Sequence, residues 1–415
     1  MQTAETLPAA PRYISLDAMR GFAVMGILAM NIIAFAMPEW AYITPMAFGG
    51  ETQADKVSWF FSFVFIDGKM RGLFSLLFGA SMMLIIQSAQ AKGESAAKVH
   101  FSRMGWLAVF GLIHFFFIWF GDILFSYAVA GCFAYLFRNW TPRRLVKWAL
   151  IILAIGLAVF GAMFGGMQVL QIIATAPGAS AEIVEQYQKM LSSEDFDFNI
   201  AKELALHRSS YTAIVTAKFS EWYTPISGAA LAILSTLPLM MMGMAAQKHG
   251  FITGDWEHRR YVRWALWLCV PGFGISAILA ATVMLLGYDK INALAVFMLW
   301  NIVPQYMLTI GYSALMILLI KRYQNSKFIK RVAAAGQAAF TNYLGTSIVM
   351  TTIFYGYGFG LYGYAGRAQL WLFVIGAWTV MLLWPRPWLI RYRYGPLEWL
   401  WRSLSRLQLQ PMQRS

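Results

Sequence analysis

Charged residues and cysteines are both scarce in this chain of 415 residues. Only 13% of the residues are Asp, Glu, Lys or Arg, whereas 59% are hydrophobic. The two cysteines, Cys132 and Cys269, lie inside apolar runs and have neither the spacing of a metal site nor that of a disulfide framework. Neither a bound metal nor a disulfide is therefore expected. So low a charge content, combined with repeated apolar runs, is typical of a protein that crosses a membrane several times.

The apolar runs predict an all-α polytopic bundle of about ten transmembrane helices, since about 20 apolar residues in a helix cross the hydrocarbon layer. The candidate spans are residues 15–37, 60–90, 105–121, 122–138, 146–169, 225–247, 264–287, 291–320, 337–357 and 368–385. The second run is too long for one straight helix and is interrupted by polar residues at 67–72. This interruption predicts either two half-helices or an interfacial helix that leads into the span.

Basic residues set the expected orientation. If the amino terminus is cytoplasmic, 24 of the 33 Lys and Arg residues fall in cytoplasmic segments. Both termini are therefore predicted to be cytoplasmic. Retention of basic loops beside anionic lipid explains the net charge of +14, so the lipid bilayer is the expected partner and nucleic acid is not.

The expected organisation has two helical bundles separated by a long external segment. Ala34-Phe35-Ala36 has the form of a signal-peptide cleavage site, but the first helix is predicted to be retained. The external segment contains two helix-like patterns and is interpreted either as a lid or as an amphipathic pair on the membrane surface. The expected parts are a cytoplasmic segment (1–14), a bundle of spans 1–5 (15–169), the external loop or lid (170–224), a bundle of spans 6–10 (225–385) and a basic cytoplasmic tail (386–415).

One face of the first predicted helix is polar. Asp17, Arg20 and Asn31 fall within roughly 60° of one another, with Asn31 about 21 Å deeper than Asp17. Ionisable residues at bilayer depth more often line a cavity than face lipid. The alternative is structural: Asp17 would interact with the helix dipole and Arg20, and Asn31 would hydrogen-bond to another helix.

His114 is the only histidine in an apolar membrane run, and Asp122 follows it at the next turn. A neutral imidazole in a dry site is a good general base, and a carboxylate beside it can fix its tautomer. Eight residues separate the two, so direct contact requires the turn to fold Asp122 back. The alternative is a buried histidine that hydrogen-bonds to a neighbouring helix.

Several stretches of the chain match the motifs of one known family: Leu16-Asp17-Ala18-Met19-Arg20-Gly21, the step from Asp17 to Asn31, Lys69 through Gly79, Gly111-Leu112-Ile113-His114, Gly121-Asp122-Ile123-Leu124, Phe340-Thr341-Asn342-Tyr343-Leu344 and 393–402. Through these motifs, residues 12–405 resemble the YeiB-like family of bacterial inner-membrane proteins. The resemblance implies a multi-pass protein of the bacterial inner membrane.

The family in turn resembles, more distantly, the transmembrane acyltransferases of the heparan-α-glucosaminide N-acetyltransferase and acyltransferase-3 types. These open with an Asp-x-x-Arg-Gly helix and move acyl groups from cytoplasmic acyl-CoA to an acceptor across the membrane. Asn31 matches an Asn of the former type. Eleven residues later, where those enzymes have a catalytic His, this chain has Tyr42.

The resemblance implies an acyl-CoA-dependent O- or N-acyltransferase that modifies an acceptor at the outer face. His114 from another helix, or Tyr42, Glu39 or Asp67, would replace the missing base, with Asn31 as an oxyanion donor. Coenzyme A would contact Asp17, Arg20, Lys69 and Arg103.

The competing hypotheses are a small-solute transporter or permease with a midplane polar site, and a structural or regulatory membrane protein without turnover. The sequence leaves open the acceptor, the acyl group and the oligomeric state, homo-oligomers included.

Overall fold

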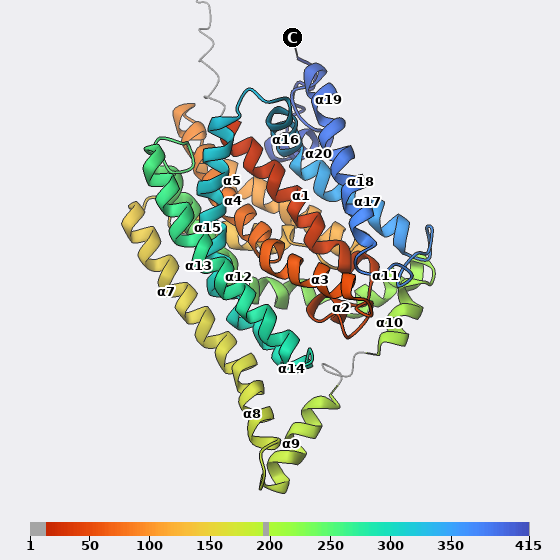
Figure 1. The fold of residues 1–415 in the computed structure, drawn as a ribbon. Coiled ribbons are helices and arrows are strands. Elements are labelled where there is room, and N and C mark those ends of the chain that lie inside the picture. Colours follow the sequence, from red (N-terminus) through yellow and green to blue (C-terminus); the bar gives the residue numbers. More distant parts are fainter. Residues whose placement is uncertain (1–13, 194–198, 415) are drawn as a thin grey trace, which may run out of the picture.

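The computed structural model describes residues 14–193 and 199–414, so residues 1–13 of the expected cytoplasmic segment lie outside the described part. Within it the protein is a bundle of helices (Figure 1). The elements are α1 (Ile14–Ala36), α2 (Glu39–Ile43), α3 (Gln53–Phe61), η1 (Ser62–Ile66), α4 (Lys69–Ala91), α5 (Ala96–Ile113), η2 (His114–Ile118), α6 (Leu124–Leu136), α7 (Pro142–Phe160), η3 (Gly161–Gly165), α8 (Gly166–Ala174), α9 (Ala181–Leu191), α10 (Ile200–His207), α11 (Tyr211–Ser220), α12 (Thr224–Lys248), α13 (His258–Leu285), α14 (Lys290–Ala295), η4 (Val296–Trp300), α15 (Ile302–Arg322), α16 (Lys327–Gln337), α17 (Ala339–Phe354), α18 (Leu370–Leu383), α19 (Pro385–Arg391) and α20 (Pro396–Arg406).

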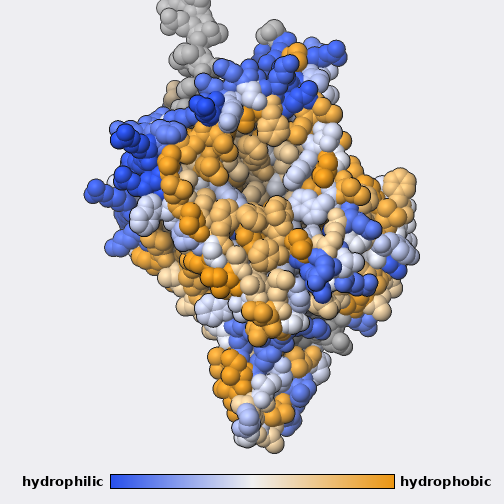
Figure 2. Space-filling model, viewed as in Figure 1, coloured by the Kyte–Doolittle hydropathy of each residue, from blue (hydrophilic) through white to orange (hydrophobic). Residues whose placement is uncertain are grey.

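The all-α multi-pass architecture predicted from the sequence is confirmed. Among the described residues, eight helical segments are long and apolar enough to cross a membrane. Two of the ten expected spans are shorter, because 122–138 forms the 13-residue α6 and 337–357 forms the 16-residue α17. Hydrophobic residues form a broad band across the middle of the surface, and hydrophilic residues gather at the end that carries the carboxy-terminal helices (Figure 2).

The helix break expected at 67–72 is present. The helical segment Gln53–Ala91 comprises α3, the π-helical η1 and α4, and it is interrupted at Asp67 and Gly68. Asp67 is extended, and Gly68 has a φ of 71°, a left-handed conformation that costs glycine little. The break places charged residues inside the bundle, because Asp67 and Lys69 are both buried.

α1 is the central helix of the bundle, and it packs against α4, α16 and α17 (Figure 1). The contact with α16 is close: a Cβ atom on Gly336 would lie 1.8 Å from the Asp17 carbonyl oxygen, and one on Gly21 would lie 2.0 Å from the Val332 carbonyl oxygen. Glycine at both positions therefore lets the two backbones touch, as small residues commonly do in membrane bundles. This contact fixes the start of α1, where Asp17 and Arg20 lie.

The segments expected outside the two bundles are also helical. The region 170–224 contains the end of α8, followed by α9, α10 and α11; α7 and α8 form a long arm from which α9 folds back (Figure 1). The expected basic tail forms α19 and α20, and α20 packs against α5 and α17. The tail is therefore part of the bundle, and it closes one end of it.

Candidate functional site

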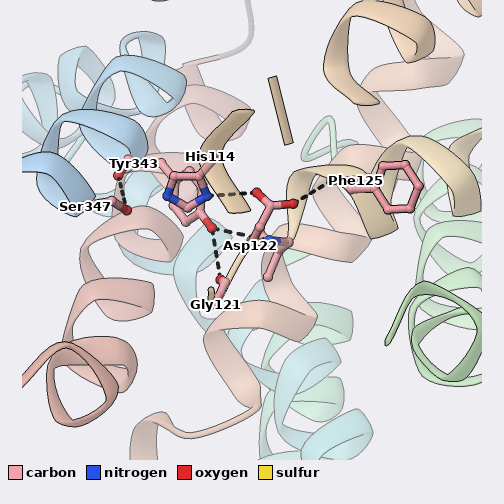
Figure 3. A network of polar contacts seen from close by, with 7 residues as sticks. His114, Gly121, Asp122, Phe125, Tyr343 and Ser347 are labelled. Atoms are coloured by element: carbon pink, nitrogen blue, oxygen red, sulfur yellow. Dashed lines mark hydrogen bonds and ion pairs between the residues drawn. The ribbon is translucent and has the colours of Figure 1, made fainter. Parts of the chain in front are cut away.

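His114 and Asp122 are in direct contact (Figure 3). α5 continues into η2, Trp119 is extended, and the chain reverses before α6 begins. This turn folds Asp122 back, so that its Oδ1 lies 2.9 Å from His114 Nδ1. Asp122 Oδ2 accepts a hydrogen bond of 2.8 Å from the Phe125 amide in the first turn of α6. One carboxylate therefore holds the imidazole and the start of the next helix together.

The dyad is dry. The side chain of His114 is fully buried and that of Asp122 is 3% exposed. Because Nδ1 faces a carboxylate, the geometry assigns the proton to Nδ1 and leaves Nε2 as an acceptor. His114 Nε2 is buried and has no hydrogen-bond partner in the described part of the chain. The imidazole is thus held in the form that a general base requires.

Two aromatic residues that the sequence analysis did not select flank the dyad. The ring centroids of Tyr343 and Trp119 lie 5.3 Å and 6.2 Å from that of His114. The Trp119 indole N–H is buried and, like His114 Nε2, has no hydrogen-bond partner among the described residues. Trp119 also stacks on Phe35 of α1 at 4.0 Å. The end of the third span therefore reaches the first helix through this pair of rings.

A cavity of about 550 Å³ leads from one end of the bundle toward the dyad. Arg20, Arg103, Arg393 and Arg402 line it, together with Tyr343, whose ring contacts His114. His114 is eleven residues beyond Arg103, which is about 16 Å along the helix. The cavity therefore joins a cluster of guanidinium groups to the neighbourhood of the buried base.

Three of the four residues predicted to contact coenzyme A line this cavity: Asp17, Arg20 and Arg103. Arg20 Nη1 lies 3.4 Å from Asp17 Oδ1, and its Nη2 donates to Ser81. The Arg103 guanidinium lies over the Trp401 ring at 4.1 Å. The fourth residue, Lys69, is not in the cavity lining: it is fully buried at the helix break and donates to the Phe63 carbonyl.

The remaining predicted residues lie apart from the cavity lining. Asn31 is buried in α1, one helical turn before Phe35. The Tyr42 hydroxyl donates to Asp67 Oδ1 at 2.6 Å, and burial together with this carboxylate raises the pKa of Tyr42 well above its ordinary value. Tyr42 is therefore bound to the helix break as a hydrogen-bond donor, and it is poorly suited to act as a base.

The carboxy-terminal segment contributes site residues that were assigned to a tail. Arg393, Glu398 and Arg402 line the cavity. Glu398 accepts hydrogen bonds from the amides of Phe340 and Thr341 at 2.7 and 3.1 Å, which satisfies the start of α17, and burial raises its pKa. The signal for these residues was the motif at 393–402, which was recognised as a resemblance but not as part of a site.

Comparisons with known proteins agree with these motifs. Residues 245–408 match the family described as "Protein of unknown function (DUF418)". The chain is 29% identical to the uncharacterized protein YeiB of Escherichia coli (strain K12) over 95% of this chain and 96% of that protein.

Two Bacillus proteins are also similar. The uncharacterized protein YxaH of Bacillus subtilis (strain 168) is 29% identical over 96% of this chain and 95% of that protein. An uncharacterized 39.9 kDa protein of Bacillus acidopullulyticus is 24% identical over 94% of this chain and 93% of that protein. The chain is therefore similar along nearly its whole length to the uncharacterized YeiB and YxaH proteins, and its segment 245–408 matches the DUF418 family.

Proposed function

We propose that the protein is a transmembrane acyltransferase of the bacterial cytoplasmic membrane that uses cytoplasmic acyl-CoA. One observation carries this proposal: a single cavity connects four arginines to the surroundings of a buried His–Asp dyad. Acyl transfer from a thioester needs both features, a site for the phosphates of the donor and a base for the acceptor.

The arginine end of the cavity suits the phosphates of coenzyme A. One guanidinium group can donate two parallel hydrogen bonds to the oxygens of a phosphate, and arginine keeps its charge when it is buried. Arg103 and Arg402 lie over the rings of Trp401 and Tyr394, and neither forms an ion pair with any described residue. Their hydrogen-bond donors are therefore available to a ligand. The predicted orientation places this end of the cavity at the cytoplasm, where acyl-CoA is found.

The dyad supplies the chemistry at the other end. His114 Nε2 would take the proton from an acceptor hydroxyl or amine while the acceptor oxygen or nitrogen attacks the acyl carbonyl carbon. The carbon–sulfur bond then breaks, and the coenzyme A thiolate leaves and takes up the proton from the imidazolium. The indole N–H of Trp119, whose ring lies 6.2 Å from that of His114, could stabilise the developing oxyanion. The amide of Asn31, one turn before Phe35 in α1, is the second candidate donor.

A small-solute transporter remains the second candidate, and the helix break favours it. Broken helices with buried polar residues form midplane sites in many transporters. Here the break buries Asp67 and Lys69, and Asp67 Oδ2 has no hydrogen-bond partner in the described part of the chain. The arginine-lined cavity is not required for such a function.

Thermal unfolding of the purified full-length protein with coenzyme A tests the proposal. A ligand that binds only the folded state stabilises it by about 2.7 kcal/mol at a concentration of 100 times its Kd. We expect coenzyme A to raise the unfolding midpoint, and the double variant Arg103→Gln/Arg402→Gln to lose this response. Arg143→Gln, which neutralises an exposed arginine of α7, should keep the response.

An unchanged midpoint at millimolar coenzyme A and at millimolar acetyl-CoA would exclude the donor site, and with it the enzyme. Transport would then be the better hypothesis.

A further inference from the structure

Arg71 is an exposed arginine near the middle of a membrane-spanning segment. It lies in the first turn of α4, directly after the helix break, within the 39-residue segment Gln53–Ala91. Its neighbours Gly72 and Leu73 are buried, whereas Arg71 itself is exposed. Arg71 lies within the motif Lys69 through Gly79, but neither the predicted site residues nor the proposed acyl transfer includes it.

The position of Arg71 along α4 places it deep in the bundle. Ser81, which accepts a hydrogen bond from Arg20 at the arginine end of the cavity, lies ten residues further along α4. Ten residues of α-helix span about 15 Å, roughly half the thickness of the hydrocarbon layer. A guanidinium group at this depth is costly in contact with lipid, so it must face a polar opening or a bound group.

Tyr127 separates Arg71 from the arginine-lined cavity. Tyr127 lines that cavity, and its hydroxyl donates to the Arg71 carbonyl oxygen at 3.0 Å. Arg71 is not part of the cavity lining. Tyr127 lies two residues, or about 3 Å along the axis of α6, beyond Phe125, whose amide donates to Asp122 of the dyad. Arg71 therefore lies behind the cavity wall, at a distance from the dyad that one small molecule can span.

The Arg71 guanidinium lacks a partner within the described residues. No hydrogen bond, ion pair or ring contact joins it to residues 14–193 or 199–414. Asp67 and the hydroxyls of Tyr42 and Tyr306 lie within electrostatic range, but Tyr42 donates to Asp67, and Tyr306 donates to the Ser235 carbonyl. A guanidinium group at this depth is normally paired or faces a water-filled cavity, so an exposed one without a partner among the described residues is suited to bind an anion that comes from outside the chain.

We infer that Arg71 binds the acidic group, a phosphate or a carboxylate, of the second substrate. This inference rests on the proposed function in that it calls the ligand an acceptor; the anion site itself does not depend on it. An acceptor held by its acidic group at Arg71 would extend past Tyr127 toward His114 and Asp122. The protein then has two anion sites: the arginine-lined cavity for the donor and Arg71 for the acceptor.

The acidic group can belong to a lipid headgroup or to a water-soluble molecule, and two probes separate these sources. The unfolding midpoint of the full-length protein in uncharged detergent is measured with inorganic phosphate at constant ionic strength. It is measured separately with phosphatidylglycerol against phosphatidylcholine. All titrations use the Arg103→Gln/Arg402→Gln background, so that the donor cavity does not contribute. A response to phosphate alone indicates a soluble acceptor, and a response to phosphatidylglycerol alone indicates a lipid-linked one.

We expect at least one probe to raise the midpoint, and Arg71→Gln to weaken the apparent affinity at least tenfold. Arg71→Lys keeps the charge but not the paired donors, so it should fold and retain part of the affinity. Arg143→Gln is the matched control and should respond like the background protein. The inference is overturned if neither probe raises the midpoint, or if Arg71→Gln and Arg71→Lys both respond like the background protein.

The two proposals fail separately. In the chain with its cavity arginines intact, Arg71→Gln should leave the response to coenzyme A unchanged, and loss of that response would show that Arg71 belongs to the donor site. If coenzyme A leaves the unfolding midpoint unchanged but phosphate or phosphatidylglycerol still raises it in an Arg71-dependent way, acyl transfer is refuted and the anion site at Arg71 stands.

Discussion

At the scale of single residues, the contact between His114 and Asp122 matters most. The carboxylate occupies Nδ1, and the opposite nitrogen is buried without a partner in the described part of the chain. A structural histidine would normally have both nitrogens satisfied. The unpaired Nε2 therefore favours a chemical role over a purely structural one.

His114→Ala should abolish acyl transfer and leave a folded, monodisperse protein. Loss of a general base costs about 10²–10⁴-fold in rate, so turnover of acyl-CoA by the reconstituted protein should fall at least 100-fold. His114→Asn is the companion variant, because its amide can still donate a hydrogen bond to Asp122 but cannot take the proton from the hydroxyl or amine of the acceptor substrate. Turnover within threefold of the unaltered protein in both variants would assign His114 to the structure alone.

The sequence identified several residues of the site but not the distant residues that they contact. Asp17, Arg20, His114 and Asp122 stand out because charged and titratable residues are rare in apolar runs. Arg402 and Tyr343 lie in the motifs 393–402 and 340–344, but residue type alone does not mark them as site residues, because one belongs to a basic segment and the other is a tyrosine in an apolar helix. What makes them site residues is contact across some 300 and 230 positions of sequence, and spacing carries no signal for that.

At the scale of elements, the close contact of α1 with α16 positions the polar face of α1. Gly336→Ala would place a methyl group 1.8 Å from the Asp17 carbonyl oxygen, so the two helices must separate. We expect a loss of about 1–3 kcal/mol in stability, seen as a lower thermal unfolding midpoint, together with weaker binding of coenzyme A. Gly105→Ala in α5 is the control: its Cβ would meet nothing within 4 Å, and alanine favours the helix. Equal midpoints for the two variants would contradict this account.

α10 is attached to the start of α2 and to the turn at Tyr362 through a titratable group. Glu203 accepts hydrogen bonds from the Glu39 amide at 2.8 Å and the Tyr362 hydroxyl at 3.0 Å, and burial raises the pKa of Glu203 to about 7. Between the ordinary value near 4.5 and pH 7, the unfolded chain releases this proton while the folded chain retains it. The contribution of Glu203 to stability is therefore greatest at low pH, and it is lost as the pH rises to about 7.

Unfolding midpoints measured from pH 4.5 to pH 8 test this assignment. In the unaltered protein, stability should fall between pH 4.5 and 7 by about a tenfold change in the folding equilibrium for each unit of difference between the folded and unfolded pKa of Glu203. Glu203→Gln should remove this fall in stability. Identical pH profiles for the variant and the unaltered protein would contradict the assigned pKa.

Most elements were predictable from the apolar runs, including the helix break at Asp67 and Gly68 and the helical patterns in the external segment. Two features were not. The π-helical turn η2 has no residue pattern that distinguishes it from an α-helix. Together with the following turn, it nevertheless brings Asp122 back to His114. The packing of α20 on α5 and α17 depends on tertiary contacts that a basic, mixed sequence does not reveal.

At the scale of the whole molecule, the start of α1 and the carboxy-terminal helices lie at the same end (Figure 1). The distribution of basic residues predicts that this end is cytoplasmic. A reporter that is active only in the cytoplasm should therefore be active when fused after residue 414 and inactive when inserted at the exposed Gly178. The opposite pattern would show that the protein has the reverse orientation, with the arginine-lined cavity facing away from the cytoplasm, where acyl-CoA is found.

The wall of that cavity has a consequence for truncation of the chain. Arg393, Glu398, Trp401 and Arg402 follow the last long apolar segment, Leu370–Arg391, yet they line the same cavity as Asp17 and Arg20. The cavity proposed to bind the donor is thus completed by residues that follow the last of these long apolar segments. A chain cut after residue 391 would keep every one of these segments but would lack these four residues of the cavity lining.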